Sequence, residues 1–326
     1  GSKNTFANGA FRFNLTGFYY KYKSLQLSRI VARTSVNDNV DAYIYGLEAE
    51  AIIKPSRSLL VNMGFSYLHT KVAADKFLGN PRDPSGGRSD SVIIKDITNG
   101  SNCAVRPNVA GNGAGANAFV TAVNGVINSI GASRAPGGVN PAPLQAPTAF
   151  PAGSGIGSTG AFSVCQILDL GAQGRIAALN PAFAPVQAVL NSFGSFTVEN
   201  SGVPVNIKGN KLPQAPNYKF SVGAQYTAEF ANGMTLIPRA DLTYTGDSFG
   251  NIFNGPINKV KGYSQINAQI QLNGRDDRWY IRGFVQNLAN NNATTGLYVA
   301  DQSQGLFTNV FTLEPRRYGI GAGFKF

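Results

Sequence analysis

The sequence predicts an all-β fold, an antiparallel β-barrel that spans a membrane, and three observations lead to this prediction. First, about eight segments alternate apolar residues with polar or small ones, which is the pattern of a strand with two unlike faces. Second, several of these segments exceed the roughly 5–6 residues typical of strands in soluble sheets. Third, their connections are alternately short and long, and membrane barrels place short turns on the periplasmic side and long loops outside.

The composition supports this fold class and narrows the partners. Of 326 residues only 14% are charged, while 38 are Gly and 34 are Tyr or Phe (13 and 21), a composition that favours strands and turns. The sequence contains no apolar run of about 18 residues, so no membrane-spanning helix is predicted. The net charge of +11 is scattered along the chain, so we expect no nucleic-acid partner. We expect the surface to face outer-membrane lipid and lipopolysaccharide.

Residues 1–71 are predicted to form barrel strands. In residues 11–24 the alternation slips at Gly17, which indicates either a bulge or a change of surroundings. Residues 25–34 extend this strand, and residues 36–40 (VNDNV) read as a turn or loop. Residues 41–54 and 59–67 then alternate well on either side of a short turn, which predicts a hairpin.

Residues 72–206 lose the strand pattern and are predicted to form one very long extracellular loop. Helical spacing of apolar residues between Phe119 and Ile130 predicts one short helix, and residues 184–193 predict another. Cys103 and Cys165 both lie in this insert, and we expect them to form a single disulfide rather than two buried free thiols. With His69 as the only histidine, no zinc site is expected.

Residues 207–326 are predicted to return to barrel strands. Pro238 stands inside one of them and is tolerable at an edge or a bulge. Residues 265–273 alternate Gln and Asn with apolar residues, which suits a wet lumen on one face and lipid on the other. In the last strand the apolar face comprises Tyr318, Ile320, Ala322, Phe324 and Phe326, opposite a Gly-rich face.

The sequence gives little support for catalysis. Glu48 and Glu50 share a strand face roughly 7 Å apart, a spacing that could suit a glycosidase pair. Two lumen charges are the simpler interpretation, and His69 has no evident catalytic partners. We therefore expect no enzyme, no cofactor and no metal site, and an outer-membrane hydrolase is the weakest of the function classes considered.

Five stretches, in order along these strands, resemble one known family. They are Gly1-Ser2-Lys3, residues 45–50 (YGLEAE), residues 209–216 (GNKLPQAP), residues 285–288 (VQNL) and residues 314–319 (EPRRYG) followed by the terminal Phe326. Together they are similar to the C-terminal barrel half of TonB-dependent outer-membrane receptors. The resemblance covers residues 1–71 and 206–326 and does not extend to the insert. Ala289-Asn290 replaces the Phe-Asp that often follows the fourth motif.

The resemblance implies a barrel of about 22 strands in the outer membrane of a Gram-negative bacterium, of which this chain would be the last third or so. It implies a receptor for active uptake of a siderophore or other scarce nutrient. TonB would act only through an N-terminal plug that this stretch does not contain. A final strand ending in Tyr318, Phe324 and Phe326 would be the signal for the barrel-assembly machinery. In a complete receptor it would close the barrel against the first strand. The alternative is a complete small barrel with a structural or adhesive role.

The candidate contacts for a small-molecule ligand come from the predicted lumen and loops. On the lumen face they are Glu48, Glu50, Arg239, Asp241, Gln265 and Gln269. In the loops they are the aromatics Phe253 and Tyr298. The sequence does not identify the ligand.

Overall fold

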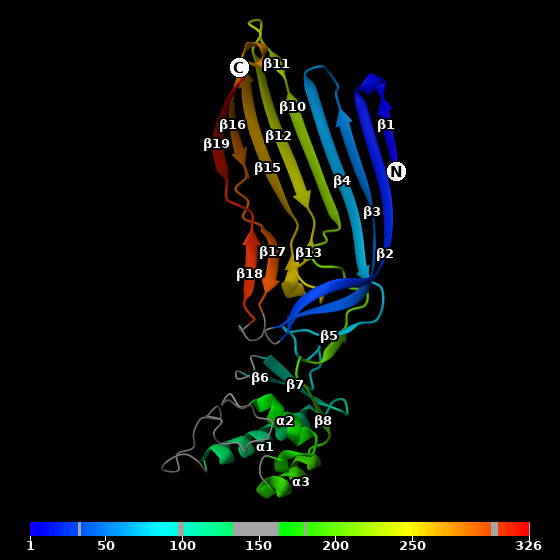
Figure 1. Ribbon diagram of the computed structural model, residues 1–326, viewed down its shortest axis with the longest axis vertical. Helices are drawn as coiled ribbons and strands as arrows, with labels where there is room; N and C mark the ends of the chain where they lie inside the picture. The colour runs from blue at the N-terminus through cyan, green and yellow to red at the C-terminus, as the bar shows by residue number, and fades with distance from the viewer. Residues whose placement is uncertain (32–33, 97–100, 133–162, 179–180, 301–305, 326) are drawn as a thin grey trace.

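A computed structural model describes residues 1–31, 34–96, 101–132, 163–178, 181–300 and 306–325. Its main element is one antiparallel sheet in the order β1-β2-β3-β4-β10-β12-β15-β16-β19, with the short β11 also paired to β12 (Figure 1). Its strands are β1 Ser2–Phe6, β2 Phe11–Val31, β3 Thr34–Ile53, β4 Leu59–Val72, β10 Tyr218–Tyr226, β11 Ala228–Glu229, β12 Thr235–Thr245, β15 Tyr263–Asn273, β16 Trp279–Gln286 and β19 Arg317–Phe324. Within the described residues the sheet is open, with β1 and β19 at its edges.

The short connections lie at one end of the sheet and the long ones at the other (Figure 1). Residues 54–58, 230–234 and 274–278 join β3 to β4, β11 to β12 and β15 to β16. The insert and the longer loops project from the opposite end, which we call the loop end. The all-β antiparallel architecture predicted from the sequence is confirmed, and among the described residues no helix is long and apolar enough to cross a membrane.

The connection after β2 differs from the prediction of a loop at residues 36–40. These residues belong to β3, which stays paired with β2 as far as Val31↔Thr34. The two strands form an arm that bends across the loop end of the sheet (Figure 1). Val36 and Val40 alternate with Asn37 and Asn39 in exposure, so a period of two is present in this polar stretch.

The slip of the alternation at Gly17 comes from a change of surroundings and involves no bulge. The register between β2 and β3 is continuous from Phe11↔Ile53 to Tyr22↔Ala42, and the shift lies after Tyr22. Paired residues of antiparallel strands share a face, so Phe18 lies on the same face as Glu48 and Glu50. Aromatic residues thus replace polar ones on that face toward the loop end.

Pro238 stands in a central strand and interrupts one ladder. It pairs with Ile270 of β15 on one side. On its other side β12 pairs with β10 as far as Gln225↔Arg239 and with β11 from Ala228↔Leu236 onward, in the same register. The pairing is interrupted between these two pairs, at Pro238. Because proline has no N–H to donate, this gap separates β10 from β11, so the expected edge or bulge is not needed.

The insert contains a small α/β unit with its own core. Its three-stranded sheet pairs β6 Val92–Asp96, β7 Ser101–Pro107 and β8 Phe196–Glu199, and its helices are α1 Gly113–Ala132, α2 Val164–Ala172 and α3 Ala184–Ser192. Both predicted helices are present, and α2 was not predicted. Apolar side chains from all three helices meet β7 and β8 in the core, among them Phe119, Ile167, Leu190 and Phe196. We call residues 92–199 the insert unit.

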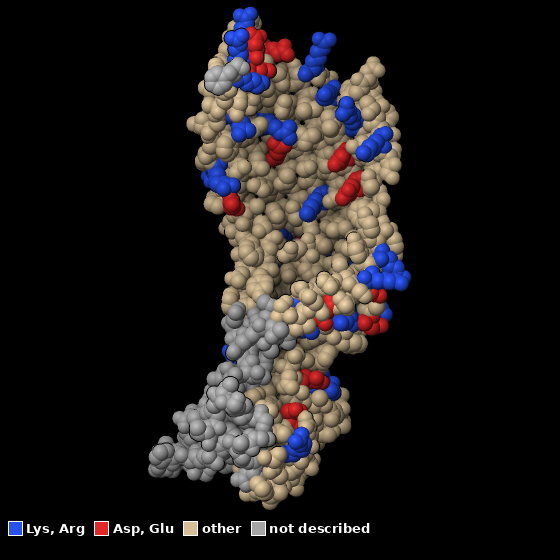
Figure 2. Space-filling model, viewed as in Figure 1, with Lys and Arg blue, Asp and Glu red and all other residues tan. Residues whose placement is uncertain are grey.

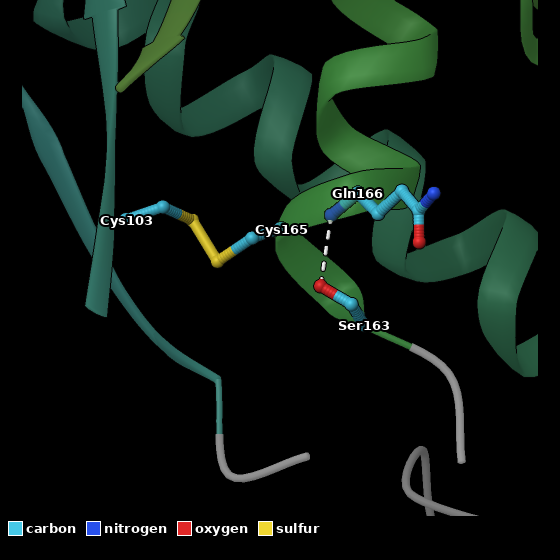
Figure 3. Close-up of a disulfide and its surroundings, with 4 residues drawn as sticks. All are labelled: Cys103, Ser163, Cys165 and Gln166. Carbon is cyan, nitrogen blue, oxygen red and sulfur yellow. Dashed lines mark hydrogen bonds between the residues drawn. A yellow bond between two sulfur atoms is a disulfide. The ribbon is translucent and has the colours of Figure 1, made fainter. Parts of the chain in front are cut away.

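A disulfide joins the sheet of the insert unit to α2 (Figure 3). Cys103 of β7 and Cys165 of α2 are buried, and their Cα atoms are 6.0 Å apart. Two residues before Cys165, the Ser163 hydroxyl accepts a hydrogen bond of 3.1 Å from the Gln166 N–H and caps the helix (Figure 3). The bridge and the cap together fix the start of α2 against the sheet.

A second, smaller core closes the loop end. Its buried members are Val40, Val72, Leu78, Ile207 and Ile252, which come from the β2–β3 arm, β4, β5 (Phe77–Gly79) and two loops. The remaining short elements lie around it: β5 pairs with β9 Pro204–Asn206, β13 Ser248–Phe249 with β14 Lys259–Val260, and β17 Thr294–Val299 with β18 Thr308–Thr312. The pairing of β5 with β9 brings the two ends of the insert together.

Candidate inner wall of the barrel

One face of the sheet carries all six polar residues predicted to line the lumen. The register runs without a break in the row Glu50↔Gly64↔Ser221↔Thr243↔Gln265, across β3, β4, β10, β12 and β15. Side chains of directly paired residues share a face, and residues two apart on a strand do so too. Glu48, Arg239, Asp241 and Gln269 therefore join this face, which we call the inner wall.

The opposite face is apolar over the same rows. Between the ends of the sheet, paired rows such as Phe65↔Phe220↔Tyr244 run across it. Phe220 stacks on Tyr244 with ring centroids 5.3 Å apart. Many of these side chains are exposed, including Met63, Phe65, Ile270 and Ile281, as expected for a surface that meets lipid rather than a protein core.

Arg239 and Asp241 form an ion pair on the inner wall. The Arg239 guanidinium donates from Nε to Asp241 Oδ2 at 2.8 Å and from Nη2 to Asn62 Oδ1 at 3.0 Å, so the network joins β12 to β4 across β10. It passes over Gly223, where a Cβ would lie 2.6 Å from Arg239 Nη2 and 2.7 Å from Asn62 Oδ1. Glycine at this position leaves room for the pair to lie flat on the wall.

Glu48 and Glu50 lie on β3, apart from this network. Both side chains are exposed, and Asn14 donates a hydrogen bond of 3.3 Å to Glu50 Oε2. Among the described residues neither has an ion-pair partner. Two carboxylates without a described ion pair therefore lie on the wall, where they can accept further hydrogen bonds or attract a cation.

The glutamines extend the inner wall along β15. Gln269 pairs with Arg239, and Gln265 pairs with Thr243. The Gln265 amide lies 3.4 Å from Asn267 Oδ1, and Gln271 donates to Asn273 Oδ1 at 2.7 Å, so neighbouring amides on this face interact along the strand. Such a row offers donors and acceptors without net charge.

The structure adds Arg282 to the inner wall, a residue outside the sequence-based candidates. It pairs with Gln271, and its guanidinium lies 5.6 Å from the centroid of the Phe284 ring. Arg282 Nε is buried without a hydrogen-bond partner. The alternation of β16 could have indicated it, because Arg282 falls opposite Ile281 and Gly283 in the period-two pattern.

The two loop aromatics have different surroundings. Phe253 packs against the loop-end core and is partly buried. Tyr298 on β17 is 41% exposed and pairs with Asn309 of β18. Of the two, Tyr298 is the more exposed to a molecule approaching the loops.

Carboxylates with lowered pKa values secure the loops. Partial burial acts to raise the pKa of Asp38, but hydrogen bonds and charges from Arg29 and Lys76 outweigh it and lower the pKa. Hydrogen bonds from Arg88 and from the Gly111 N–H lower the pKa of Asp90. Both carboxylates therefore stay ionised to a lower pH than an ordinary aspartate, and their hydrogen bonds tie the arm and the insert unit to neighbouring residues.

Two of the sequence motifs are hydrogen-bond centres of the loop end. In residues 209–216, the Asn210 amide donates to the Ile252 carbonyl at 2.9 Å and the Leu212 N–H donates to Thr70 Oγ1 at 3.0 Å. In residues 285–288, buried Asn287 has a φ of 51° and donates to the carbonyls of Asn291 and Glu314. These motifs join consecutive loops to the strand ends, which is a structural role.

The end of the chain completes the apolar face. On β19, Tyr318 and Phe324 are exposed at 71% and 64% and pair with Val285 and Trp279. Phe326, the third residue of the predicted assembly signal, lies outside the described residues. In the described part of the chain no group of three or more His, Cys, Asp or Glu residues is placed to hold a metal ion.

Charge is spread thinly over the molecule. Figure 2 shows basic and acidic side chains interspersed on the visible face of the sheet, and the largest gathering lies at the end with the short turns. At that end the turn of residues 274–278 contains Arg275, Asp276 and Asp277. This pattern matches a surface that meets lipid on one side and water on the other more closely than one built to bind a polyanion.

Comparisons with known proteins agree with this architecture. A family model described as "TonB dependent receptor-like, beta-barrel" matches residues 166–288, which includes the last part of the insert. No curated protein matches the sequence.

Solved structures similar to this chain include two receptors and a copper transporter. The ferric yersiniabactin uptake receptor FyuA from Yersinia pestis is 12% identical, with a TM-score of 0.49, and the match covers 98% of this chain and 28% of that one. The siderophore receptor PiuA from Acinetobacter baumannii is 10% identical, with a TM-score of 0.46, and the match covers 98% of this chain and 26% of that one. The copper transporter OprC is also 10% identical, with a TM-score of 0.46, and the match covers 98% of this chain and 30% of that one.

The chain thus spans only 26–30% of the length of these structures. The likeness to this family comes from the family model over residues 166–288, and the open antiparallel sheet with its two unlike faces agrees with it. Residues 166–288 therefore resemble part of the β-barrel of TonB-dependent receptors, a family found in the outer membrane of Gram-negative bacteria.

Proposed function

We propose that this chain forms part of the wall and the extracellular gate of a receptor that takes up a scarce nutrient, such as a ferric siderophore, with energy supplied through TonB. The observation that carries the proposal is the inner wall, where polar residues are continuous across five neighbouring strands opposite an apolar face. A wall of this kind lines a passage for water-soluble molecules.

Within this proposal the wall residues contact the ligand on its way through the barrel. Glu48 and Glu50 are exposed and free of ion pairs in the described chain, so they can bind donors or cationic groups. Arg239 and Asp241 satisfy one another, so they contribute a fixed dipole rather than a free charge. Tyr298 offers an aromatic surface at the loop end.

The insert would serve as a lid or ligand arm over the extracellular mouth. It projects from the loop end, has its own core and is attached through paired β5 and β9. A unit that folds around its own core can move or bind as a body while the sheet stays in place.

Uptake measured in living cells tests the proposal. A strain lacking the gene is complemented with the full-length protein that carries this chain, either unchanged or as Glu48→Gln with Glu50→Gln. The uptake of labelled ferric siderophores and copper is then followed with and without a protonophore. We expect gene-dependent uptake of one nutrient that the protonophore abolishes, and an uptake several-fold lower in the double variant because two acceptors lose their charge.

The matched control is Asp276→Asn with Asp277→Asn, which makes the same change of charge in the exposed turn between β15 and β16. Uptake equal to that of the wild type is expected there. Gene-independent uptake of every nutrient, or uptake insensitive to the protonophore, would refute the proposal.

The role of the insert is tested separately. Because Gly79 pairs with Pro204, residues 80–203 can be replaced by a two-residue Asn-Gly turn that closes the hairpin. Ligand binding lost in this variant, at normal surface levels, supports a lid or ligand arm. Unchanged binding and uptake would show that the insert has no part in either.

A further inference from the structure

A row of three residues on the apolar face breaks its apolar character. Lys21 of β2, Tyr43 of β3 and Lys71 of β4 pair directly with one another, as Lys21↔Tyr43 and Tyr43↔Lys71. They share the face of Leu47 and Phe65, which is opposite the inner wall. Both lysines are exposed.

The row has a defined height on the sheet. The first row of the same three strands is Phe11↔Ile53↔Val61, next to the short turns. Each of Lys21, Tyr43 and Lys71 is ten residues from its counterpart in that row (11 to 21, 53 to 43, 61 to 71). Because a barrel strand crosses the hydrocarbon layer in about 9–11 residues, the row lies where acyl chains give way to head groups.

An aromatic layer lies directly beneath this row. Tyr45 stacks on His69 at 4.7 Å and lies 6.3 Å from Tyr19, centroid to centroid. Aromatic rings collect at the interface between membrane and water because one end of the ring is apolar and the other can be hydrated. The layer therefore supports the same height for the row above it.

The two lysines converge on one ring. Their ammonium nitrogens lie 5.8 Å (Lys21) and 5.7 Å (Lys71) from the centroid of the Tyr43 ring, one from each neighbouring strand. Neither makes an ion pair with a described carboxylate. Asp41, two residues before Tyr43 on the same face of β3, accepts a hydrogen bond from the Ser24 N–H at 2.9 Å.

We propose that Lys21, Tyr43 and Lys71 bind a phosphate group of lipopolysaccharide at the outer edge of the membrane. Two uncompensated ammonium groups held on either side of one ring offer several donors to a phosphate, and the tyrosine hydroxyl offers another. The lysine stems and the ring lie along the apolar face while the charged ends reach the head groups. The assignment requires the loop end to face outward, as in the proposed function.

Lipid binding to the purified full-length protein tests this inference by native mass spectrometry. The probes are lipid A with its phosphates, the same lipid after phosphatase treatment, and inorganic phosphate alone. The variants are Lys21→Gln with Lys71→Gln, Lys21→Arg with Lys71→Arg, and Lys219→Gln. Lys219 is an exposed lysine on the inner wall, in the row of Glu48.

We expect the double glutamine variant to bind phosphorylated lipid A about tenfold or more weakly. Each lysine near an anionic surface raises the affinity for that surface several-fold. The arginine pair should retain binding and the Lys219 control should equal the wild type. Equal binding of the dephosphorylated lipid would overturn the assignment, as would equal binding by the glutamine pair. Binding of inorganic phosphate at matching affinity would assign the site to a soluble anion instead.

The inference and the proposed function can fail separately. Uptake in the double glutamine variant should stay close to that of the wild type, because the row lies outside the lumen. If no nutrient is taken up but the lipid result holds, the uptake proposal falls and the lipid site stands. If uptake holds and the lipid result fails, the reverse is true.

Discussion

At the scale of single residues, glycines on the last strand decide how large side chains fit on the inner wall. Gly319 and Gly323 of β19 pair with Phe284 and Tyr280 of β16. A Cβ on Gly319 would lie 2.9 Å from Phe284 Cε2 and closer still to Cζ, and one on Gly323 would lie 2.8 Å from Tyr280 Cζ. The two rings therefore lie across the strand where glycine leaves space, which explains the Gly-rich face seen in the sequence.

Replacing Gly319 by alanine should disturb this packing, while the same change at Gly321 should not. At Gly321 the nearest atom to a new Cβ, Arg282 Nη2, is 3.7 Å away. We expect Gly319→Ala to lower stability by about 1–3 kcal/mol through overpacking and to reduce the fraction of full-length protein that resists heat unfolding in gel-shift assays. Gly321→Ala should match the wild type.

A second substitution separates overpacking from other effects of the first. Phe284→Ala removes the ring that the new Cβ would meet, so Gly319→Ala combined with Phe284→Ala should be no worse than Phe284→Ala alone. Full additivity of the two losses would show that the ring is not what limits position 319.

At the scale of elements, the disulfide should matter to the insert unit and little to the sheet. Cys103 and Cys165 are 62 positions apart, and closing a loop of that length stabilises a fold by ~4 kcal/mol in the chain-entropy model. In cells producing the full-length protein with Cys103→Ser and Cys165→Ser, we expect external protease to cut within residues 92–199. Heat resistance of the barrel should be retained, because the sheet and the insert unit have separate cores.

Two outcomes would contradict this view of the disulfide. Equal protease resistance with and without the bridge would show that the core alone holds the insert unit. Loss of the heat-resistant barrel would show that the two parts fold together. Cutting only after the outer membrane is permeabilised would show that the insert lies on the periplasmic side.

The insert unit should also lose stability in acid through Asp90. Hydrogen bonds from Arg88 and Gly111 lower the pKa of Asp90 below its usual 3.8. A carboxylate with a lowered folded-state pKa adds stability above its unfolded pKa and loses it as pH falls through the folded value. Protease resistance of the insert unit should therefore fall below about pH 4, and less so in Asp90→Asn. An identical pH profile for both proteins would rule Asp90 out.

At the scale of the whole molecule, the alternation of residues was enough to predict the strands and the face of each predicted lumen residue. The prediction succeeded because a barrel strand has lipid on one side and water on the other, so each strand alternates apolar and polar residues with a period of two. Glu50 and Gln265 could be assigned to one face from their own strands, far apart in sequence. Their common row follows only from the register.

Other features could not be predicted because they depend on contacts distant in sequence. Residues 36–40 read as a loop, yet Val40 is buried in the loop-end core and Asp38 pairs with Arg29 and Lys76. Helix α2 has only nine residues, and its burial depends on α1, α3 and β8. The Arg239–Asp241–Asn62 network required the register across β4, β10 and β12.

The central claim is that the inner wall faces water and the opposite face meets lipid. On β4, Asn62 and Ser66 belong to the inner wall and Met63 and Phe65 to the apolar face, within the same five residues. Single cysteines at these four positions can carry spin labels in the full-length protein, because Cys103 and Cys165 are bonded to each other.

The most direct measurement is the collision of these labels with oxygen, which dissolves in lipid, and with a water-soluble nickel chelate, in reconstituted bilayers. We expect labels at Met63 and Phe65 to collide mainly with oxygen and labels at Asn62 and Ser66 to collide mainly with the chelate. Equal accessibility at all four positions, or the reverse assignment, would contradict it.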